Sequence, residues 1–290
     1  MADLALLALT LAWGTTFLLV KNALEGTSAG VFLLLRFGLA AAAVAAVWLW
    51  RRDRPGPGLW RQGALLGLAM WGGFAFQTLG LRHTTPSRSA FLTGLAVLFV
   101  PFLSRFLHRR SVSPSAWAGV ALAVVGLAGL YRGAISAEVR WGDLLTLGCA
   151  VCYAFQIVWT AEWSARHPLA LLTLVQVGTT FALASLLLPL EPPRLGSGPA
   201  LWATVAFTGL AMTAGAFFVM NWAQRHTSAV RAALIYSLEP VAAAAFSWRF
   251  GGEVLSAGQV AGGALIVAGV VVGEVGAALR ARLRGVGATG

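Results

Sequence analysis

Four ionisable side chains stand inside apolar stretches of the chain, where charge is costly. They are Arg36, Arg88, Arg231 and Glu239. A charged group at the centre of a membrane span costs about 2.5–3.5 kcal/mol on insertion scales, so each of the four is a candidate functional residue. Glu239 is the only carboxylate deep in any expected span. It could bind a substrate ammonium, carry a coupling proton, or pair with an arginine beside Pro240.

Aromatic and uncharged polar residues recur midway along four apolar stretches. An amide that faced lipid would have no hydrogen-bond partner, so the Gln and Asn side chains among them predict a water-exposed cavity. Aromatic faces with a few amides and hydroxyls would suit a flat, amphipathic solute. For each single aromatic, packing against lipid or a neighbouring helix is the alternative role. The set is Trp13, Thr15, Thr16, Trp71, Phe74, Gln77, Thr78, Tyr153, Gln156, Phe217, Asn221 and Trp222.

Patterns typical of catalytic or metal sites are weak in this chain. Its four histidines stand near expected loops and form no H-E-x-x-H motif. Cys149 and Cys152 make a C-x-x-C pair inside an apolar run, without a second pair or a nearby histidine, which favours two small apolar helix residues. The sequence has no glycine-rich phosphate loop and no nucleophile–base arrangement. We therefore expect no enzymatic activity, no cofactor and no metal.

The composition places the chain in a lipid bilayer. Of its 290 residues, 58% are hydrophobic and 11% are charged, whereas a soluble domain has roughly 45–50% and about 25%. The net charge is +11, but the arginines stand mainly between apolar runs, which the positive-inside rule explains better than a nucleic-acid partner. The N-terminus lacks the basic region of a secretory signal, so we expect the first apolar run to be kept as a membrane helix.

Membrane spans account for nearly the whole chain. A spanning helix needs about 20 predominantly apolar residues, and the connections between the apolar runs are too short for a soluble domain. The predicted fold class is an all-α integral membrane protein. It has ten transmembrane helices, near residues 3–21, 29–50, 59–80, 86–106, 114–131, 142–161, 168–190, 199–222, 228–249 and 256–279.

The second half of the chain repeats the first. Adding 143 to Arg82–Gly126 gives Arg225–Gly269 without a gap, with 14 identities in 45 aligned positions. Earlier in each half the offset is 140, which places Trp13 on Tyr153. Because five spans per half is an odd number, the second half must enter the membrane in the opposite orientation. We predict inverted five-helix repeats at residues 1–135 and 140–280, followed by a short basic tail at 281–290.

The inversion gives a role to one arginine pair. Arg231 is the repeat equivalent of Arg88, so the two are expected on opposite sides of the membrane. One hypothesis is that they flank the two mouths of a central pathway and help to close or line each gate. The alternative is that both side chains snorkel to the membrane interface.

The distribution of positive charge predicts the orientation. With a cytoplasmic N-terminus, twelve Lys and Arg residues fall on the inner side, six on the outer side and three within spans. That asymmetry favours cytoplasmic placement of both termini. Tryptophans near the expected span ends, such as Trp48, Trp60, Trp141 and Trp248, fit an aromatic belt.

Glycines at helical spacing predict close packing of helices. In lipid, small residues let helix backbones approach each other, where apolar burial offers little driving force. Packing within one chain is favoured over a dimer face, so we expect a monomer or a weak homodimer. The pairs are Gly63/Gly67, Gly119/Gly126, Gly258/Gly262 and Gly269/Gly273.

Several short motifs, in this order and spacing, resemble the drug/metabolite transporter superfamily and most closely its EamA type. The resemblance covers essentially the whole chain and implies ten spans in two inverted repeats. The motifs are Ala12-Trp13-Gly14-Thr15, Leu35-Arg36-Phe37, Ala90-Phe91-Leu92-Thr93, Val100-Pro101, Ser237-Leu238-Glu239-Pro240, Gly252-Glu253, and the run from Gln259 to Gly269.

The resemblance implies export of metabolites, amino acids or drugs from the bacterial cytoplasm across the inner membrane. Aromatic-amino-acid exporters of this group are similar in length and layout, and they give the best single substrate prediction. One departure concerns the acidic residue after the ninth span. The first half has Arg109-Arg110 where the second has Gly252-Glu253, so this acidic residue occurs only once.

The mechanism expected from these features is alternating access, in which two halves rock about a midplane cavity that holds a small-molecule substrate. Bending is expected at Gly72-Gly73, Gly94, Pro101 and Pro240. Export of drugs or other metabolites, and a passive facilitator or channel, are the alternatives. Nucleotide-sugar exchange is a weaker one, because no cluster of buried lysines is expected. The predicted pathway residues are Trp13, Thr16, Trp71, Phe74, Gln77, Thr78, Arg88, Tyr153, Gln156, Phe217, Asn221, Arg231 and Glu239.

Overall fold

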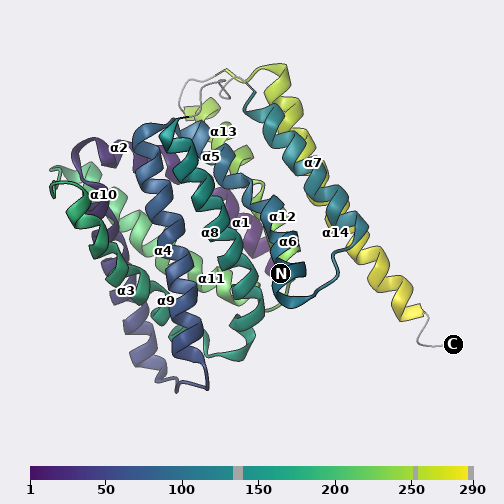
Figure 1. Ribbon diagram of the computed structural model, residues 1–290, viewed down its shortest axis with the longest axis horizontal. Helices are drawn as coiled ribbons and strands as arrows, with labels where there is room; N and C mark the ends of the chain where they lie inside the picture. The colour runs from purple at the N-terminus through teal and green to yellow at the C-terminus, as the bar shows by residue number, and fades with distance from the viewer. Residues whose placement is uncertain (133–139, 251–253, 287–290) are drawn as a thin grey trace.

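The computed structural model describes residues 1–132, 140–250 and 254–286, and in these residues all secondary structure is helical (Figure 1). The Gly252-Glu253 motif and the last residues of the predicted basic tail lie outside this part of the chain. The helices are α1 (Ala2–Gly14), α2 (Thr16–Gly26), α3 (Ala29–Arg51), α4 (Leu59–His83), α5 (Pro86–Gly94), α6 (Ala96–His108), α7 (Pro114–Leu130), α8 (Trp141–Trp163), α9 (Leu169–Ala184), α10 (Pro199–Ala206), α11 (Ala216–Ala223), α12 (Ala229–Tyr236), α13 (Glu239–Phe250) and α14 (Ala257–Val286).

Within the described residues, nine helical stretches are long and apolar enough to cross a membrane, and Pro114–Leu130 is a shorter apolar helix. This confirms the all-α membrane fold with about ten spans. The predicted spans and the helices agree to within a few residues at most ends. For example, the span expected at residues 29–50 is Ala29–Arg51.

Polar residues start several of the helices. The Thr85 side chain accepts a hydrogen bond from the backbone N–H of Arg88, and Pro86 follows at the first helical position. The side chain of Ser228 accepts in the same way from the backbone N–H of Arg231. Such caps satisfy amides that have no partner inside the helix. They fix where each arginine enters the first turn of its span.

Several spans are interrupted midway, and the interruptions only partly match the expected bends. The regular helix breaks at Thr15 between α1 and α2, at Leu95 just after Gly94, and at residues 237–238 just before Pro240. By contrast, α4 runs unbroken through Gly72-Gly73. There a Cβ atom on Gly73 would collide with the ring of Tyr153. These two glycines therefore serve packing against α8 rather than a break.

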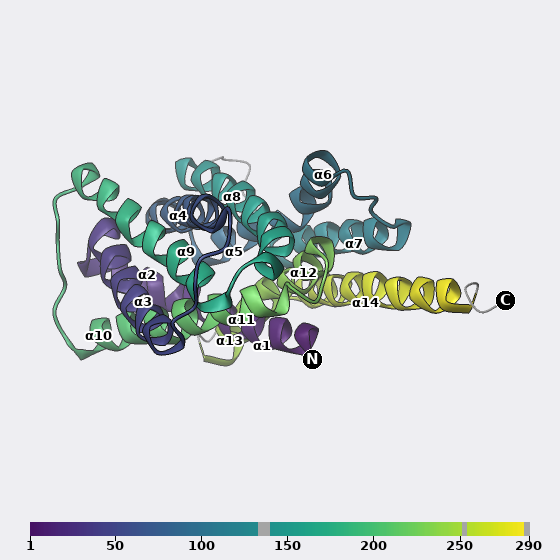
Figure 2. The same ribbon diagram turned by 90° about the horizontal axis from the view of Figure 1, so that it is seen from below.

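A long antiparallel helix pair, α7 and α14, runs along one edge of the molecule in both views (Figures 1 and 2). Glycines bring the two backbones into contact. A Cβ atom on Gly126 would lie 2.6 Å from the carbonyl oxygen of Gly262, and a Cβ atom on Gly119 would lie 2.5 Å from that of Gly269. These glycines pack within the chain, as expected for small residues between membrane helices.

We expect Gly262→Ala to lower the stability of the folded protein. Its new Cβ atom would meet the backbone of α7, 2.6 Å from the carbonyl oxygen of Gly126, and overpacking of this kind costs about 1–3 kcal/mol. Thermal unfolding in detergent would measure the loss. Gly178→Ala is the matched control, because a Cβ atom there meets no atom within 4 Å. Equal midpoints for the two variants would contradict this account of the α7–α14 contact.

Candidate functional site

A cavity lies among the helices of both halves of the chain. Its volume is about 80 Å³, which is smaller than the roughly 300–1,000 Å³ of sites that hold drug-sized ligands. It therefore has room for a small solute or several waters. The predicted pathway residues that line it are Trp13, Thr16, Phe74, Gln77, Tyr153, Gln156, Phe217 and Glu239.

Five other predicted pathway residues lie outside this cavity. Thr78 is buried between helices, and Trp71 packs partly buried against the apolar core. Asn221 is buried in a polar cluster, where its Nδ2 donates to Thr173 Oγ1 at 2.9 Å and to Gln176 Oε1 at 3.0 Å. The remaining two, Arg88 and Arg231, stand toward opposite ends of the bundle.

Aromatic rings from five helices form the walls of the cavity. The ring of Trp13 lies 5.7 Å from that of Phe217 and 5.8 Å from that of Tyr236. Phe74 lies 5.7 Å from Tyr153 and 6.0 Å from Phe217. These centroid separations and the tilted or edge-on planes are those of favourable aromatic pairs. The rings in the cavity walls therefore support one another through direct contacts.

Two amides and the hydroxyls of Thr16, Thr93 and Ser237 line the cavity between the rings. Gln77 Nε2 donates to Thr93 Oγ1 at 3.2 Å, which links α4 to α5. The side chain of Gln156 is 2% exposed, and its Nε2 has no hydrogen-bond partner among the described residues. A buried amide without a partner costs free energy, so Gln156 is suited to meeting a polar group of a solute.

Two ionisable side chains, one basic and one acidic, also line the cavity, and both lack an ionic partner in the described part of the chain. Arg36 is 3% exposed, and its Nε donates to Thr213 Oγ1 at 2.8 Å. Its guanidinium carbon lies 4.5 Å from the ring centre of Phe74, a cation–π contact. Glu239, at the first position of α13, also lines the cavity. The sequence identified Arg36 as an ionisable residue within a span. Its position in that span did not predict that its side chain lines the cavity.

A π-helical segment, Phe207–Gly215, holds two of the residues that line the cavity, Arg36 and Trp13. Thr213 donates its hydroxyl to the carbonyl oxygen of Thr208 at 2.7 Å, which leaves its oxygen to accept from Arg36. The carbonyl oxygen of Met212 accepts from Nε1 of Trp13 at 3.1 Å. Wide helical turns of this kind occur often at functional sites. Nothing in the amino-acid pattern predicted this one.

The two halves of the transmembrane bundle meet where the helices break. A Cβ atom on Gly14 would lie 2.9 Å from the carbonyl oxygen of Glu239, and one on Gly94 would lie 3.0 Å from Cγ of Pro240. Two residues that the sequence did not single out for the site, Thr93 and Tyr236, line the cavity beside these breaks. The sequence signal for Tyr236 is its position three residues before Glu239, because residues three apart on a helix lie on the same face.

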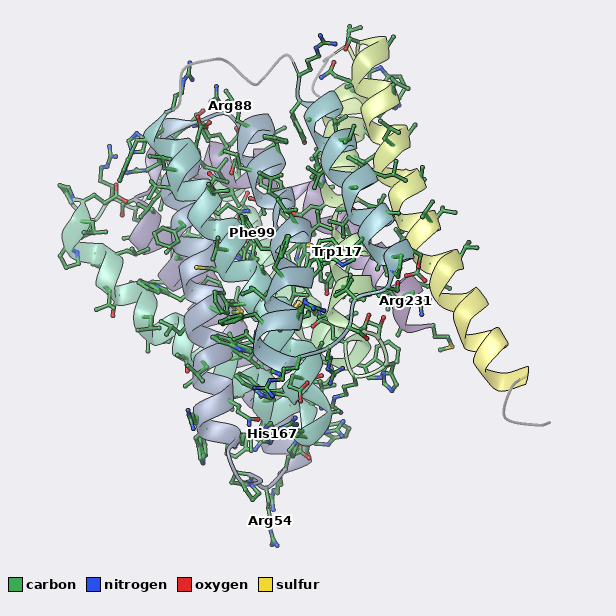
Figure 3. The ribbon with its side chains drawn as sticks, turned by 45° about the vertical axis from the view of Figure 1, so that its right-hand side comes forward. Arg54, Arg88, Phe99, Trp117, His167 and Arg231 are labelled. Atoms are coloured by element: carbon green, nitrogen blue, oxygen red, sulfur yellow. The ribbon has the colours of Figure 1, made fainter. Side chains whose placement is uncertain are left out.

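Ion pairs hold Arg88 and Arg231, which lie well apart on either side of Phe99 (Figure 3). Arg88 pairs with Asp143, with Nε 3.0 Å from Oδ1, and both side chains are almost buried. Arg231 Nη2 lies 2.9 Å from Oδ2 of Asp3, and Arg231 Nε donates to Glu274 Oε1 at 2.6 Å. The Arg231–Asp3 pair is the more exposed, with 37% of each side chain accessible to solvent.

The EamA-like transporter family model matches residues 1–132 and 140–273. The chain belongs to the EamA-like transporter family. It is a multi-pass integral membrane transporter, and the family match covers both segments that line the cavity. The superfamily expected from the motifs is therefore confirmed at this level.

Relatives of this EamA transporter carry the same general description. The chain is 30% identical over 273 residues to an uncharacterized transporter of Archaeoglobus fulgidus, covering 93% of this chain and 85% of the relative. It is 26% identical over 279 residues to the uncharacterized transporter YyaM of Bacillus subtilis, covering 92% and 91%. A solved crystal structure shares the fold with a TM-score of 0.77 at 22% identity, covering 94% of this chain and 97% of the other.

We expect a water-soluble, charged thiol reagent to label Gln77→Cys in a background where Cys149 and Cys152 are replaced by Ala. Gln77 lines the cavity, whereas Thr78 beside it is 2% exposed and does not. Labelling of Gln77→Cys should be at least about tenfold faster than labelling of Thr78→Cys, because the reaction needs an accessible thiolate. Mass spectrometry of the purified protein would measure both rates. Equal rates would mean that the cavity is closed to water.

Proposed function

We propose that this transporter exports small amphipathic metabolites, above all aromatic amino acids, from the bacterial cytoplasm by alternating access. The observation that carries the proposal is the cavity. Connected aromatic rings, two amides and two ionisable side chains without an ionic partner, one basic and one acidic, line it. An amino acid with a flat apolar side chain matches that mixture, because rings stack on its side chain and polar groups meet its ends.

We further propose that the chain lies in the inner membrane with both termini in the cytoplasm. The excess of arginines on the side of residues 51–54, 105–110 and 280–284 supports this orientation. In this placement the Arg231 end of the bundle faces the cytoplasm and the Arg88 end faces outward. Export then moves the solute from the Arg231 side to the Arg88 side.

Two inverted five-helix repeats, at residues 1–135 and 140–280, complete the proposal. The ion pairs support it. Arg231 follows Arg88 by 143 residues, and Asp143 follows Asp3 by 140. Hence the Arg88–Asp143 pair and the Arg231–Asp3 pair are equivalent under the proposed repeat, because each residue of one pair corresponds to a residue of the other. The family match to two separate segments, 1–132 and 140–273, agrees with the same division.

Each ion pair joins the two proposed repeats at one end of the pathway, so we assign the pairs as gates. The Arg88–Asp143 pair is 11% and 8% exposed, and Asp143 also accepts from Thr84 Oγ1 at 2.9 Å. Breaking a buried pair by removing one partner costs about 3–5 kcal/mol, whereas an exposed pair contributes about 0–1 kcal/mol. The Arg88–Asp143 pair, the proposed outer gate, should therefore cost more free energy to open than the Arg231–Asp3 pair.

The first test is counterflow of labelled phenylalanine or tryptophan in proteoliposomes. We expect saturable counterflow, and Trp13→Ala should raise the half-saturation concentration about 2- to 10-fold through loss of its aromatic contacts. Trp202→Ala is the control, because Trp202 is half exposed and does not line the cavity. Linear flux without counterflow would favour a passive facilitator or channel. Counterflow with drugs but not with amino acids would favour the drug-exporter alternative.

The gates have a test of their own. Arg88→Ala leaves Asp143 without its arginine, so we expect transport at least about tenfold slower. Exchanging the charges, with Arg88→Asp and Asp143→Arg together, should recover part of the activity. Arg51→Ala is the control, because Arg51 meets Asp53 in an exposed pair near a helix end. Unchanged transport after Ala substitution at both Arg88 and Arg231 would refute the gate assignment.

A further inference from the structure

Arg36 brings unused hydrogen-bond donors to the cavity. A guanidinium has five N–H donors, and in the described part of the chain Arg36 uses only Nε, toward Thr213. No carboxylate among the described residues lies within ion-pair distance of it. The residue is 3% exposed and lines the cavity. The two terminal nitrogens are therefore free to meet an anionic group there.

Neighbouring residues fix the orientation of the Arg36 guanidinium before any solute binds. Thr213 holds its Nε side, and the ring of Phe74 lies beneath it at 4.5 Å. Gly209 lets the π-helical segment approach the backbone of Arg36, since a Cβ atom there would lie 2.9 Å from the Arg36 carbonyl oxygen. A planar guanidinium held in one orientation can bind a carboxylate with two parallel hydrogen bonds.

Glu239 brings an acidic side chain to the same cavity. It stands at the first position of α13, directly after the helix break at residues 237–238. Its carboxylate has neither a hydrogen bond nor an ion pair with any side chain that the structure describes. An unpaired carboxylate in an apolar bundle is costly, unlike that of Asp143, which is held by Arg88. A cationic group of a solute would relieve that cost.

The two charges lie on different walls and do not meet each other. Arg36 belongs to α3, which packs against α9 and the π-helical segment, whereas Glu239 belongs to α13, which packs against α1 and α5. Tyr153 lies within electrostatic range of both side chains. A solute in this cavity can therefore contact the guanidinium with its carboxylate and the carboxyl group of Glu239 with its ammonium.

We propose that Arg36 and Glu239 form a two-point site for a zwitterion, the carboxylate and ammonium of an α-amino acid. Arg36 binds the carboxylate, Glu239 binds the ammonium, and the rings of Trp13, Phe217 and Tyr236 contact the side chain. This inference rests on the proposed amino-acid export and adds a specificity rule to it. A solute that lacks either charge leaves Arg36 or Glu239 without a partner in the cavity, and a site of this kind rejects such a solute strongly.

The test compares three ligands of one shape on the purified transporter in detergent. L-Phenylalanine carries both charges, phenethylamine lacks the carboxylate, and 3-phenylpropionate lacks the ammonium. Calorimetric titration should show phenylalanine binding at least about tenfold more tightly than either analogue, since a hydrogen bond to a charged group is lost in each case. Equal binding of all three ligands by the unaltered protein would overturn the two-point site.

Two variants then assign the two ends. Arg36→Gln should abolish the preference for phenylalanine over phenethylamine while keeping the preference over 3-phenylpropionate. Glu239→Gln should do the reverse. Arg36→Lys keeps the charge without the planar fork and should keep part of the preference. Arg105→Gln, at an exposed position away from the cavity, is the matched control. Equal weakening of all three ligands by Arg36→Gln would show that Arg36 only supports the fold.

The same measurements separate this inference from the proposed function. Saturable phenylalanine counterflow with no discrimination against the analogues would leave amino-acid export standing and refute the zwitterion site. Absence of both binding and counterflow for any amino acid would refute the export proposal as well. Thermal unfolding of each variant checks its folding, and the analogue series on the unaltered protein needs no variant.

Discussion

The interior of a bilayer offers no water to solvate charge, and this constraint orders the whole molecule. Backbone polar groups find partners inside helices, so the described residues form helices and no strands. Apolar burial gives little drive for helices to associate in lipid, so contact depends on shape, as where Gly126 lets α7 touch α14 at Gly262. Among the described residues, ionisable side chains in the spans are then found mainly in two settings. They pair with an opposite charge, as Arg88 does with Asp143, or they face the cavity, as Arg36 and Glu239 do.

The departures from regular helix gather around that cavity. The breaks at Thr15, at Leu95 and at residues 237–238 adjoin lining residues, and the π-helical segment Phe207–Gly215 supplies the partner of Arg36. Irregular backbone at membrane depth is tolerated where it lines a cavity or is buried in protein. The same segments have fewer regular hydrogen bonds to break, so they are the natural places for the chain to bend. In the proposed mechanism, the substrate-binding surface and the hinges therefore lie at the same level of the bundle.

The ends of the bundle work differently from its middle. There, charged residues pair across elements that are far apart in the sequence, such as Arg82 with Glu191 on one side and Arg110 with Glu162 on the other. Pairs at exposed positions are individually weak, so one end can open without a large cost. Arg36 and Glu239, in the middle, have no ionic partner among the described residues. Ion pairs at the ends and unpartnered ionisable groups in the middle agree with the proposed carrier with a central site.

The sequence by itself determined the helical membrane fold, because apolar length and the demands of lipid leave few alternatives. It also indicated that rings and amides such as Trp13, Phe74 and Gln77 share a cavity, since mid-span polar groups must face one. Only the tertiary structure decided which face each helix turns inward. Thr78 and Asn221 point to other contacts, and Arg36 turns to the cavity. In nearly uniformly apolar helices, the amino-acid pattern predicts well how deep in the membrane a residue lies. It predicts poorly how each helix is rotated about its own axis. The partner of a residue such as Arg88, 55 positions away at Asp143, follows from packing that no local pattern encodes.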